Sequence, residues 1–498
     1  MLIVAKNFVY LQIVIVAGWL IFYYSLRTDK RTAIGAYPLI IMSALTVILF
    51  FSPAYIVMSA AFFLVPIVAC RNRNQLLIVM LIGMLATPAF QTQLAAGGLW
   101  LFTWSLQSTL GLGGLVALLA TRKDQATDRS ALNISLVLFL TLVILIAARG
   151  SAISNWTRLI TSLICTYGIP AYVIGVCIKS ASGRQTLLTT LAGLGSMLGA
   201  VLAYESRVHW PLYVSLDDKY GFSGSGTVVK FRAGVMRAYG PMDESTNAGF
   251  TLVMMFAAAI ACGAIFKRGG FRYLVPAVIA LGVAAPQSRG ALIGAGVVIL
   301  AYAFYRFGAS GLGKASMVLA PLAAIYYARK SAAGTLANAD AEGTSDYRSQ
   351  LFTRGVQEFW HHPIAGDELG RVYARLEDLR QGEGIIDFVN TYLYFALAAG
   401  SIGLAVFCVV LFLPVGQLLG RRRALLSDPA AGAYAAFVFA TLLACSVMLI
   451  FTSIQQRPMI LLLALAGTAA TIRLARGKPQ GTRSSSPRSV GNLPVTEM

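Results

Sequence analysis

Apolar runs of roughly 16 to 25 residues follow one another along almost the whole chain, from about Phe8 to Arg473. Each run is long enough for a helix to cross a hydrocarbon layer of ~30 Å. None shows the alternation of apolar and polar residues that is typical of barrel strands. A chain that is 57% hydrophobic and 12% charged must be solvated by lipid. We expect an all-α polytopic membrane protein with about 14–15 transmembrane helices.

Every second connection between these runs is basic. The positive-inside rule places such short loops in the cytoplasm, so the N-terminus is predicted outside and the tail, 475–498, inside. The net charge of +20 then reflects topology, and without a basic aromatic groove it does not indicate nucleic-acid binding. The basic loops contain Arg27, Lys30 and Arg31; Arg71 and Arg73; Arg122, Lys123 and Arg129; Lys179 and Arg184; Lys267, Arg268 and Arg272; Arg306 and Lys314; and Arg421, Arg422 and Arg423.

Two long polar segments, 204–245 and 329–387, fall on the outer side and are nevertheless rich in arginine. Long loops translocate largely regardless of charge, so they do not overturn the topology. A guanidinium stays charged and binds phosphate oxygens with two parallel hydrogen bonds. An anionic substrate at the outer surface would explain these residues, which are Arg207, Arg232 and Arg237, then Arg348, Arg354, Arg371, Arg375 and Arg380.

The second polar segment carries two amphipathic patterns. One predicts a helix that begins at Ser345 and stops before His361. The other places Leu369, Val372, Leu376 and Leu379 on one helix face. Such helices lie along the membrane surface. The chain therefore divides into an N-terminal transmembrane bundle (1–203), a first extracytoplasmic loop (204–245), transmembrane helices with a Ser-Arg-Gly step (246–328), a larger extracytoplasmic loop (329–387), C-terminal transmembrane helices (388–474) and a disordered basic tail (475–498).

Four motifs occur in order between about Arg232 and Leu404, and we number them 1 to 4. They are Arg237-Ala-Tyr-Gly240 with Asn247-Ala-Gly249; Ser288-Arg289-Gly290-Ala291-Leu292; Tyr347-Arg348 with Pro363-Ile-Ala-Gly366; and Asp387-Phe-Val-Asn390-Thr-Tyr392-Leu393 with Gly400-Ser-Ile-Gly403-Leu404. In order, spacing and topology they resemble motifs of the O-antigen ligase and O-antigen or exopolysaccharide polymerase superfamily. The resemblance implies a GT-C-like helical bundle in a bacterial cytoplasmic (inner) membrane, with the active site facing the periplasm.

Three positions depart from the family pattern. Glu368 stands where the family has a second glycine after its Pro-x-x-Gly turn, which puts the turn geometry in question. Asp387 and Val389 stand where ligases have histidines, and Asn390 matches the asparagine of the same family signature. The form with aspartate is associated with polymerases, so the resemblance favours a polymerase and leaves the ligase as an alternative.

The resemblance implies transfer of a glycan from a polyprenyl-pyrophosphate-linked oligosaccharide to an acceptor hydroxyl. No Asp-x-Asp motif stands in an outer loop, so we expect no metal and no cofactor. Arginines would then stabilise the charge on the leaving pyrophosphate, and the candidates are Arg237, Arg289 and Arg348. Asp387, at the start of a span, is the candidate base. The remaining predicted substrate-binding residues are Asn390 and Tyr392, which would hold sugar hydroxyls, with Arg232, Asn247 and Arg354.

Each candidate competes with a structural explanation. Arg289 suits snorkelling to the interface, Arg237 and Arg348 suit ordinary loop charges, and Asp387 suits a helix N-cap. Arg232 and Arg354 suit solvent or lipid phosphates.

A flippase for lipid-linked oligosaccharides is the rival function. It would need charged groups at span centres, often in two related halves, and the sequence has almost no such groups and no evident repeat. Besides membrane lipids, a polymerase implies a chain-length regulator and a flippase as partners.

Overall fold

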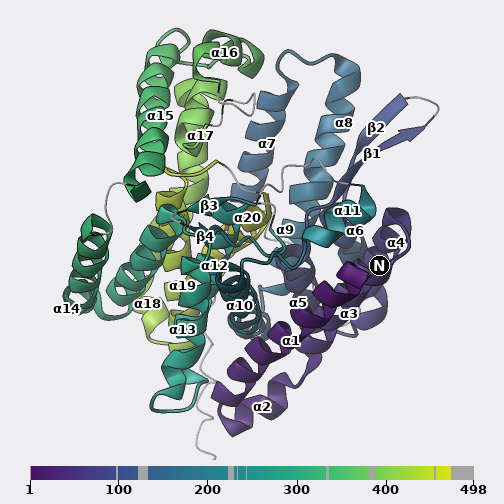
Figure 1. Ribbon diagram of the computed structural model, residues 1–498, viewed down its shortest axis with the longest axis vertical. Helices are drawn as coiled ribbons and strands as arrows, with labels where there is room; N and C mark the ends of the chain where they lie inside the picture. The colour runs from purple at the N-terminus through teal and green to yellow at the C-terminus, as the bar shows by residue number, and fades with distance from the viewer. Residues whose placement is uncertain are drawn as a thin grey trace, which may run out of the picture.

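The computed structural model of the chain describes residues 2–96, 99–121, 133–221, 229–232, 234–242, 244–332, 336–380, 386, 388–453 and 456–472. Over these ranges the protein is all-α apart from two short antiparallel hairpins (Figure 1). Two predicted features, the candidate base Asp387 and the tail 475–498, lie outside the described residues.

The N-terminal part runs from α1 to α10. Four of its helices begin at an Asn or Ser whose side chain accepts a hydrogen bond from the backbone N–H three residues later, namely Asn72, Ser105, Asn133 and Ser180. The hairpin of β1 (Gln91–Ala96) and β2 (Leu99–Ser105) stands between α5 and α6, and hydropathy did not predict it. The helices are α1 (Leu2–Ser25), α2 (Thr28–Ile34), α3 (Tyr37–Phe51), α4 (Tyr55–Ala69), α5 (Arg73–Leu85), α6 (Leu106–Ala120), α7 (Ile134–Ala148), α8 (Ile153–Leu163), α9 (Ile169–Cys177) and α10 (Ala181–Val208).

The C-terminal part contains two helices that are broken at a glycine with positive φ, α14 at Gly308 and α17 at Gly400. The hairpin of β3 (Phe231–Arg232) and β4 (Val235–Met236) follows α11. The predicted helix start at Ser345 is wrong, because α15 already begins at Leu336. The helices are α11 (Val214–Tyr220), α12 (Ser245–Ala261), α13 (Phe271–Ala284), α14 (Arg289–Ala332), α15 (Leu336–Phe359), α16 (Leu369–Arg375), α17 (Thr391–Gly420), α18 (Arg422–Leu426), α19 (Pro429–Met448) and α20 (Gln456–Ala469).

By helix length and hydropathy the chain is a multi-pass membrane protein. Within the described ranges seven helices are long and apolar enough to cross a membrane: Leu2–Ser25, Asn155–Cys177, Ala181–Val208, Ser245–Ala264, Arg289–Pro321, Thr391–Gly420 and Pro429–Met448. An eighth span results if the pair Thr28–Ile34 and Tyr37–Phe51, bent by 42°, counts as one. Six further apolar helices have only 10–17 residues. The predicted 14–15 crossings require these shorter helices to cross as well, so that number stays a prediction.

Helices α10, α12 and α19 form the centre of the bundle, since most of their residues are buried, whereas α1 and α14 leave much of their apolar surface exposed. Small residues let the central backbones approach closely, as is typical of helix packing in membranes. A Cβ on Gly282 of α13 would lie 2.5 Å from the Cα of Gly199 in α10. One turn earlier in α10, the Ser196 hydroxyl donates to the Gly18 carbonyl of α1 at 2.7 Å.

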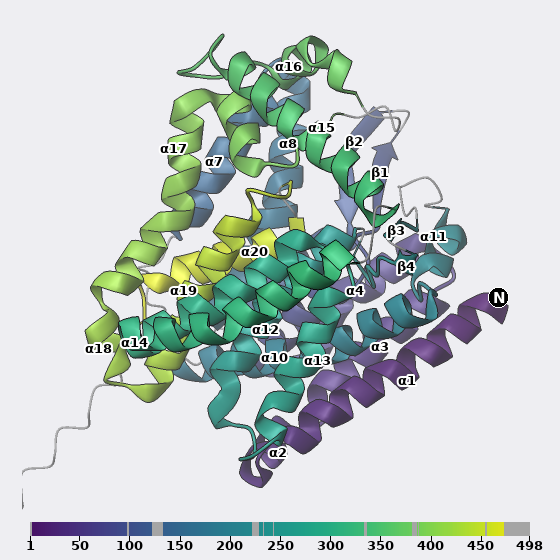
Figure 2. The same ribbon diagram turned by 60° about the vertical axis from the view of Figure 1, so that its left-hand side comes forward.

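Contacts between connections sort the helix ends into two groups. We call one the basic end: it contains the α1–α2 and α12–α13 connections, which pair through a β-bridge between Leu26 and Phe266, and the break of α14, where Arg422 donates to the Tyr305 carbonyl. We call the other the loop end: it contains α11, β3, β4, α15 and α16. In Figure 2, α11 and the β3–β4 hairpin lie on the right at about mid-height, whereas α18 lies on the left and α2 at the bottom.

Candidate functional site

Motif 1 packs at the loop end against the corner that precedes motif 2. Arg237 donates through Nε to the Pro286 carbonyl at 3.1 Å, and Arg232 donates through Nη1 to the Gln287 carbonyl at 2.7 Å. Gln287 itself has a φ of 51°, which is uncommon for a residue with a side chain. The two arginines thus hold the turn from which Arg289 and α14 begin.

The second half of motif 1 also contacts motif 2. A Cβ on Gly249 of α12 would lie 2.7 Å from the Cβ of Ala291 in α14 and 3.5 Å from that of Ser288, which directly precedes α14. Only a glycine therefore allows the two helices to meet here. Asn247, two residues earlier, is buried, and its Oδ1 has no hydrogen-bond partner among the described residues. Among the predicted substrate-binding residues, Asn247 is therefore the one whose buried side-chain oxygen accepts no hydrogen bond from any described residue.

Arg237 is the electrostatic centre of this region. Its pKa is lowered to about 10, chiefly by burial and then by the charge of Arg232; Glu244 acts in the opposite direction, and the charge of Arg348 adds to the lowering. Arg348, from α15, thus lies within electrostatic range of motif 1. A pKa of about 10 leaves Arg237 charged at neutral pH. Its terminal nitrogens have no hydrogen-bond partner among the described residues.

Arg289 completes what we call the arginine cluster, which consists of Arg232, Arg237, Arg289 and Arg348. It is the first residue of α14 and is exposed. Within the described part of the chain it forms no hydrogen bond and no ion pair. The structure therefore brings three of the predicted charge-stabilising residues to one region of the loop end.

The connection between α19 and α20, which the sequence analysis did not single out, joins motif 4 to this region. The Thr391 amide donates to the Leu449 carbonyl at 3.0 Å, and the Tyr392 hydroxyl donates to the Ser446 carbonyl at 2.9 Å. The nearest atom to a Cβ built on Gly290 of motif 2 is the Cβ of Phe451, at 3.6 Å. Motifs 2 and 4 therefore contact the same connection.

Arg457, in the first turn of α20, is a functional candidate that sequence reasoning missed. Its side chain is only 1% exposed, and Nη1 donates to the Pro241 carbonyl at 2.7 Å, directly after motif 1. The signal was available, because Arg457 stands between two apolar runs on the same predicted side as Arg289. Burying an arginine costs free energy unless the guanidinium is hydrogen-bonded. The bond to the Pro241 carbonyl reduces this cost for Arg457.

Glu205, at the end of α10, was also missed. Its carboxylate is fully buried and accepts hydrogen bonds from the amides of Leu212 and Gly240, both at 2.9 Å. It therefore ties the start and the end of the segment that carries motif 1. The buried hydroxyls of Tyr213 and Tyr239 have no hydrogen-bond partner among the described residues, and burial raises the pKa of both.

Asn390 and Tyr392 use their polar atoms within the protein. The Asn390 side chain caps α17 by accepting from the amides of Tyr392, at 3.0 Å, and Leu393, at 3.2 Å. Asn390 thus fills the N-cap role that we weighed for Asp387. The predicted contact of Asn390 and Tyr392 with sugar hydroxyls stays a prediction. The role of Asp387 as the catalytic base also stays a prediction, since Asp387 lies outside the described residues.

Motif 3 docks its Pro363–Gly366 turn into the break of α17 in motif 4. The Ser401 amide donates to the Pro363 carbonyl at 2.8 Å, and a Cβ on Gly400 would lie 2.2 Å from the Ile364 carbonyl oxygen. Arg149, from the α7–α8 connection, donates to carbonyls on both sides of this contact, Ala365 at 2.7 Å and Ala398 at 2.9 Å. The Pro363–Gly366 turn therefore needs the break of α17 at Gly400, and the break needs the turn.

Glu368 does not disturb this turn. Its backbone is extended, with φ −61° and ψ 128°, and it occupies the position before α16. The positive φ in the turn belongs to Gly366, at 68°. The departure from the family pattern at Glu368 is thus compatible with the docked geometry.

Ion pairs neutralise most arginines of the larger loop. Arg375 lies 2.5 Å from Glu358 and 2.6 Å from Asp367, and Arg371 lies 3.5 Å from Glu368. We call these five residues the ion-pair cluster. The hydrogen bond from Arg375 lowers the pKa of Asp367, and the same bond raises the pKa of Arg375.

Arg354, a predicted substrate-binding residue, pairs with Asp378 at 3.2 Å, and its role stays a prediction. The burial of the predicted apolar face is confirmed, since Val372, Leu376 and Leu379 are buried and Leu369 is partly buried. The single helix is not, because α16 ends at Arg375 and Leu379 lies in a separate 3₁₀ turn, Glu377–Leu379.

Comparison with known proteins adds no assignment. No family model matches the chain, and no curated protein matches it at a significant level.

Proposed function

We propose that the chain is a bacterial polysaccharide polymerase, for an exopolysaccharide or O-antigen, of the O-antigen ligase and polymerase type. It would transfer glycan from a polyprenyl-pyrophosphate donor to a hydroxyl of an acceptor glycan. The observation that carries this proposal is the arginine cluster. The cluster draws residues from three separate motifs, and Arg237 and Arg289 keep guanidinium nitrogens without partners among the described residues.

The electrostatics of the cluster favour an anionic ligand. Burial depresses the pKa of Arg237 most, and the positive charges of Arg232 and Arg348 depress it as well, so a pyrophosphate placed among these arginines would relieve their mutual repulsion. Guanidinium groups fixed before the reaction stabilise charge on a leaving group without having to reorganise. Arg237, Arg289 and Arg348 would bind the pyrophosphate, and Asp387 would accept the proton of the acceptor hydroxyl.

The finer topology belongs to the same proposal. We infer 14–15 crossings in a GT-C-like bundle, with the loop end in the periplasm and the basic end in the cytoplasm. The gathering of Arg27, Lys267 and Arg422 at one end supports this orientation through the positive-inside rule. Because we propose a metal-independent reaction, we expect glycan transfer to continue in the presence of a chelator.

Single replacements in the bacterial host test the proposal. We expect Arg289→Ala, Arg348→Ala and Asp387→Ala to abolish long surface glycan and to accumulate single lipid-linked repeats. Arg380→Ala is the matched control, because that arginine is exposed and paired with Glu377. Surface glycan of full length from all three variants would contradict the assignment as a polysaccharide polymerase.

The host phenotype also separates the two alternatives. Long polymer that stays on the polyprenyl carrier would identify a ligase, because polymerisation would then be intact and only transfer to the final acceptor would fail. Lipid-linked repeats that stay in the cytoplasmic leaflet would identify a flippase.

A further inference from the structure

A cavity of about 1190 Å³ opens at the basic end, away from the arginine cluster. Four parts of the chain line it: the α1–α2 connection, the α12–α13 connection, α14 just before its break and the start of α19. The Leu26–Phe266 bridge fixes the first two parts to each other. The cavity is therefore built by tertiary contacts between distant segments.

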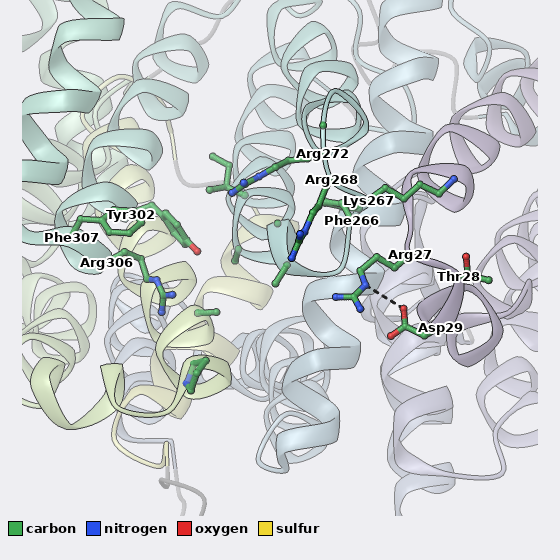
Figure 3. A pocket seen from close by; sticks show the side chains of 17 residues that line it. Arg27, Thr28, Asp29, Phe266, Lys267, Arg268, Arg272, Tyr302, Arg306 and Phe307 are labelled. Carbon is green, nitrogen blue, oxygen red and sulfur yellow. Dashed lines mark ion pairs between the residues drawn. The ribbon is translucent and has the colours of Figure 1, made fainter.

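Cations dominate the lining. Figure 3 shows the guanidinium groups of Arg27 and Arg268 near each other, with Arg272 and Arg306 on the side of Tyr302. Among the described lining residues Asp29 is the single carboxylate, and it pairs with Arg27 at 3.4 Å. Arg268, Arg272 and Arg306 have no ion pair with any described residue. Three positive charges thus face a shared space without compensation.

The wall beside these arginines is apolar and continues to the outside of the bundle. Tyr302 and Phe307 line the cavity, and Phe307 is 65% exposed. Along α13, next to Arg272, the exposed side chains include Phe271 and Tyr273. A ligand that combines a phosphate group with hydrocarbon chains matches this arrangement, because arginine pairs with the phosphate while the chains cover the apolar helices.

We propose that this cavity binds the phosphate headgroup of an anionic phospholipid from the leaflet at the basic end. The positive-inside rule explains why basic residues stand in these loops, but it does not require them to line one cavity. The site is independent of glycan transfer, so its test needs no catalytic readout.

The test measures lipid binding to the full-length protein. Delipidated protein in detergent is titrated with phosphatidylglycerol or phosphatidylcholine, and bound lipid is counted by native mass spectrometry. The cavity variant carries Arg268→Gln, Arg272→Gln and Arg306→Gln. The control variant carries Arg71→Gln, Lys314→Gln and Arg423→Gln, which remove the same charge from exposed positions at the same end outside the cavity.

We expect wild type and the control variant to bind phosphatidylglycerol on the order of a hundredfold more tightly than the cavity variant does, since each juxtamembrane cation favours anionic lipid. Equal affinity of the two variants would overturn the proposal. Displacement of the lipid by millimolar inorganic phosphate would also overturn it, by assigning the cavity to a soluble phosphate compound. If the cavity variant fails to fold, Ala433→Glu provides a second route, because it adds a carboxylate to the lining and leaves the arginines in place. Undiminished lipid binding by Ala433→Glu would count against the site.

Discussion

The arginine cluster and the ion-pair cluster both lie at the loop end, but their arginines have different partners. Arg375 faces two carboxylates, Glu358 and Asp367, at ion-pair distance. Arg237 instead donates to the neutral carbonyl of Pro286, and Arg289 has no partner among the described residues. A carbonyl orients a guanidinium without cancelling its charge. The number of arginines in a loop therefore does not locate an anion site, and the distribution of acidic partners does.

The largest expected difference between the two regions is in activity. Arg289→Ala should reduce glycan transfer in isolated membranes on the order of 10²–10³-fold, because it removes a positive charge that would stabilise the leaving group. Its melting temperature should not change, since the side chain is exposed and unpartnered among the described residues. Arg289→Lys should recover only part of the activity, because lysine lacks the bidentate geometry. Normal transfer by Arg289→Ala would remove the cluster from the mechanism.

The docking of the Pro363–Gly366 turn should show the largest effect on stability. Gly400→Ala would place a Cβ 2.2 Å from the Ile364 oxygen at a φ of 64°, so we expect a loss of more than about 2 kcal/mol in the free energy of unfolding. Gly416→Ala in the same helix is the control. Nothing lies within 4 Å of its Cβ, and alanine should be neutral or stabilising there. Thermal unfolding in detergent measures both, and equal melting temperatures would mean that the turn does not depend on the break.

Breaking the ion-pair cluster should affect stability rather than activity. Arg375→Met leaves the buried Glu358 without its partner, and the expected loss is about 1–3 kcal/mol, reduced from the value for a buried pair because Arg375 is 38% exposed. Arg380→Ala breaks an exposed pair with Glu377 and should cost less than about 1 kcal/mol. A glycan-transfer defect in Arg375→Met at unchanged stability would contradict the division between the two regions.

The smallest expected effect is the pH dependence of the ion-pair cluster. The pKa of Asp367 is lowered in the folded protein, so its contribution is complete above the ordinary aspartate pKa and is lost as the pH falls through the lower folded value. The difference in melting temperature between wild type and Asp367→Asn should therefore stay constant from about pH 8 to 5 and shrink below about pH 4. Asp367→Asn should lower stability near neutral pH and weaken this acid dependence. An identical acid profile for Asp367→Asn would show that other carboxylates are responsible.

Local patterns predicted those parts of the fold that depend on neighbouring residues. The apolar spacing of Leu369, Val372, Leu376 and Leu379 identified side chains that do pack inward, although α16 contains only the first two of them. The start of α15 was placed too late, because the capping signal at Ser345 is local whereas the helix extends back to Leu336. The β1–β2 hairpin was missed because the largely apolar sequence of β2 has the same hydropathy as an apolar helix.

The candidate site was only partly predictable. The sequence indicated Arg237, Arg289 and Arg348 by their types and their predicted side of the membrane. It could not reveal that Arg457 and Glu205 hold the same loop. The hydrogen-bond partner of Arg457 lies 216 residues away in the sequence, and the partners of Glu205 lie 7 and 35 residues away. Nor could it show that Asn390 serves as a helix cap.

By itself the sequence determined that lipid solvates this chain, that helices cross it, and that basic residues mark alternate connections, since hydropathy and charge act residue by residue. Only the tertiary structure decided which arginines keep an uncompensated charge. That property depends on whether a carboxylate or a carbonyl stands opposite each guanidinium, and distant segments supply those groups. Arg375 and Arg237 look alike in the sequence, and their different partners separate them in the fold.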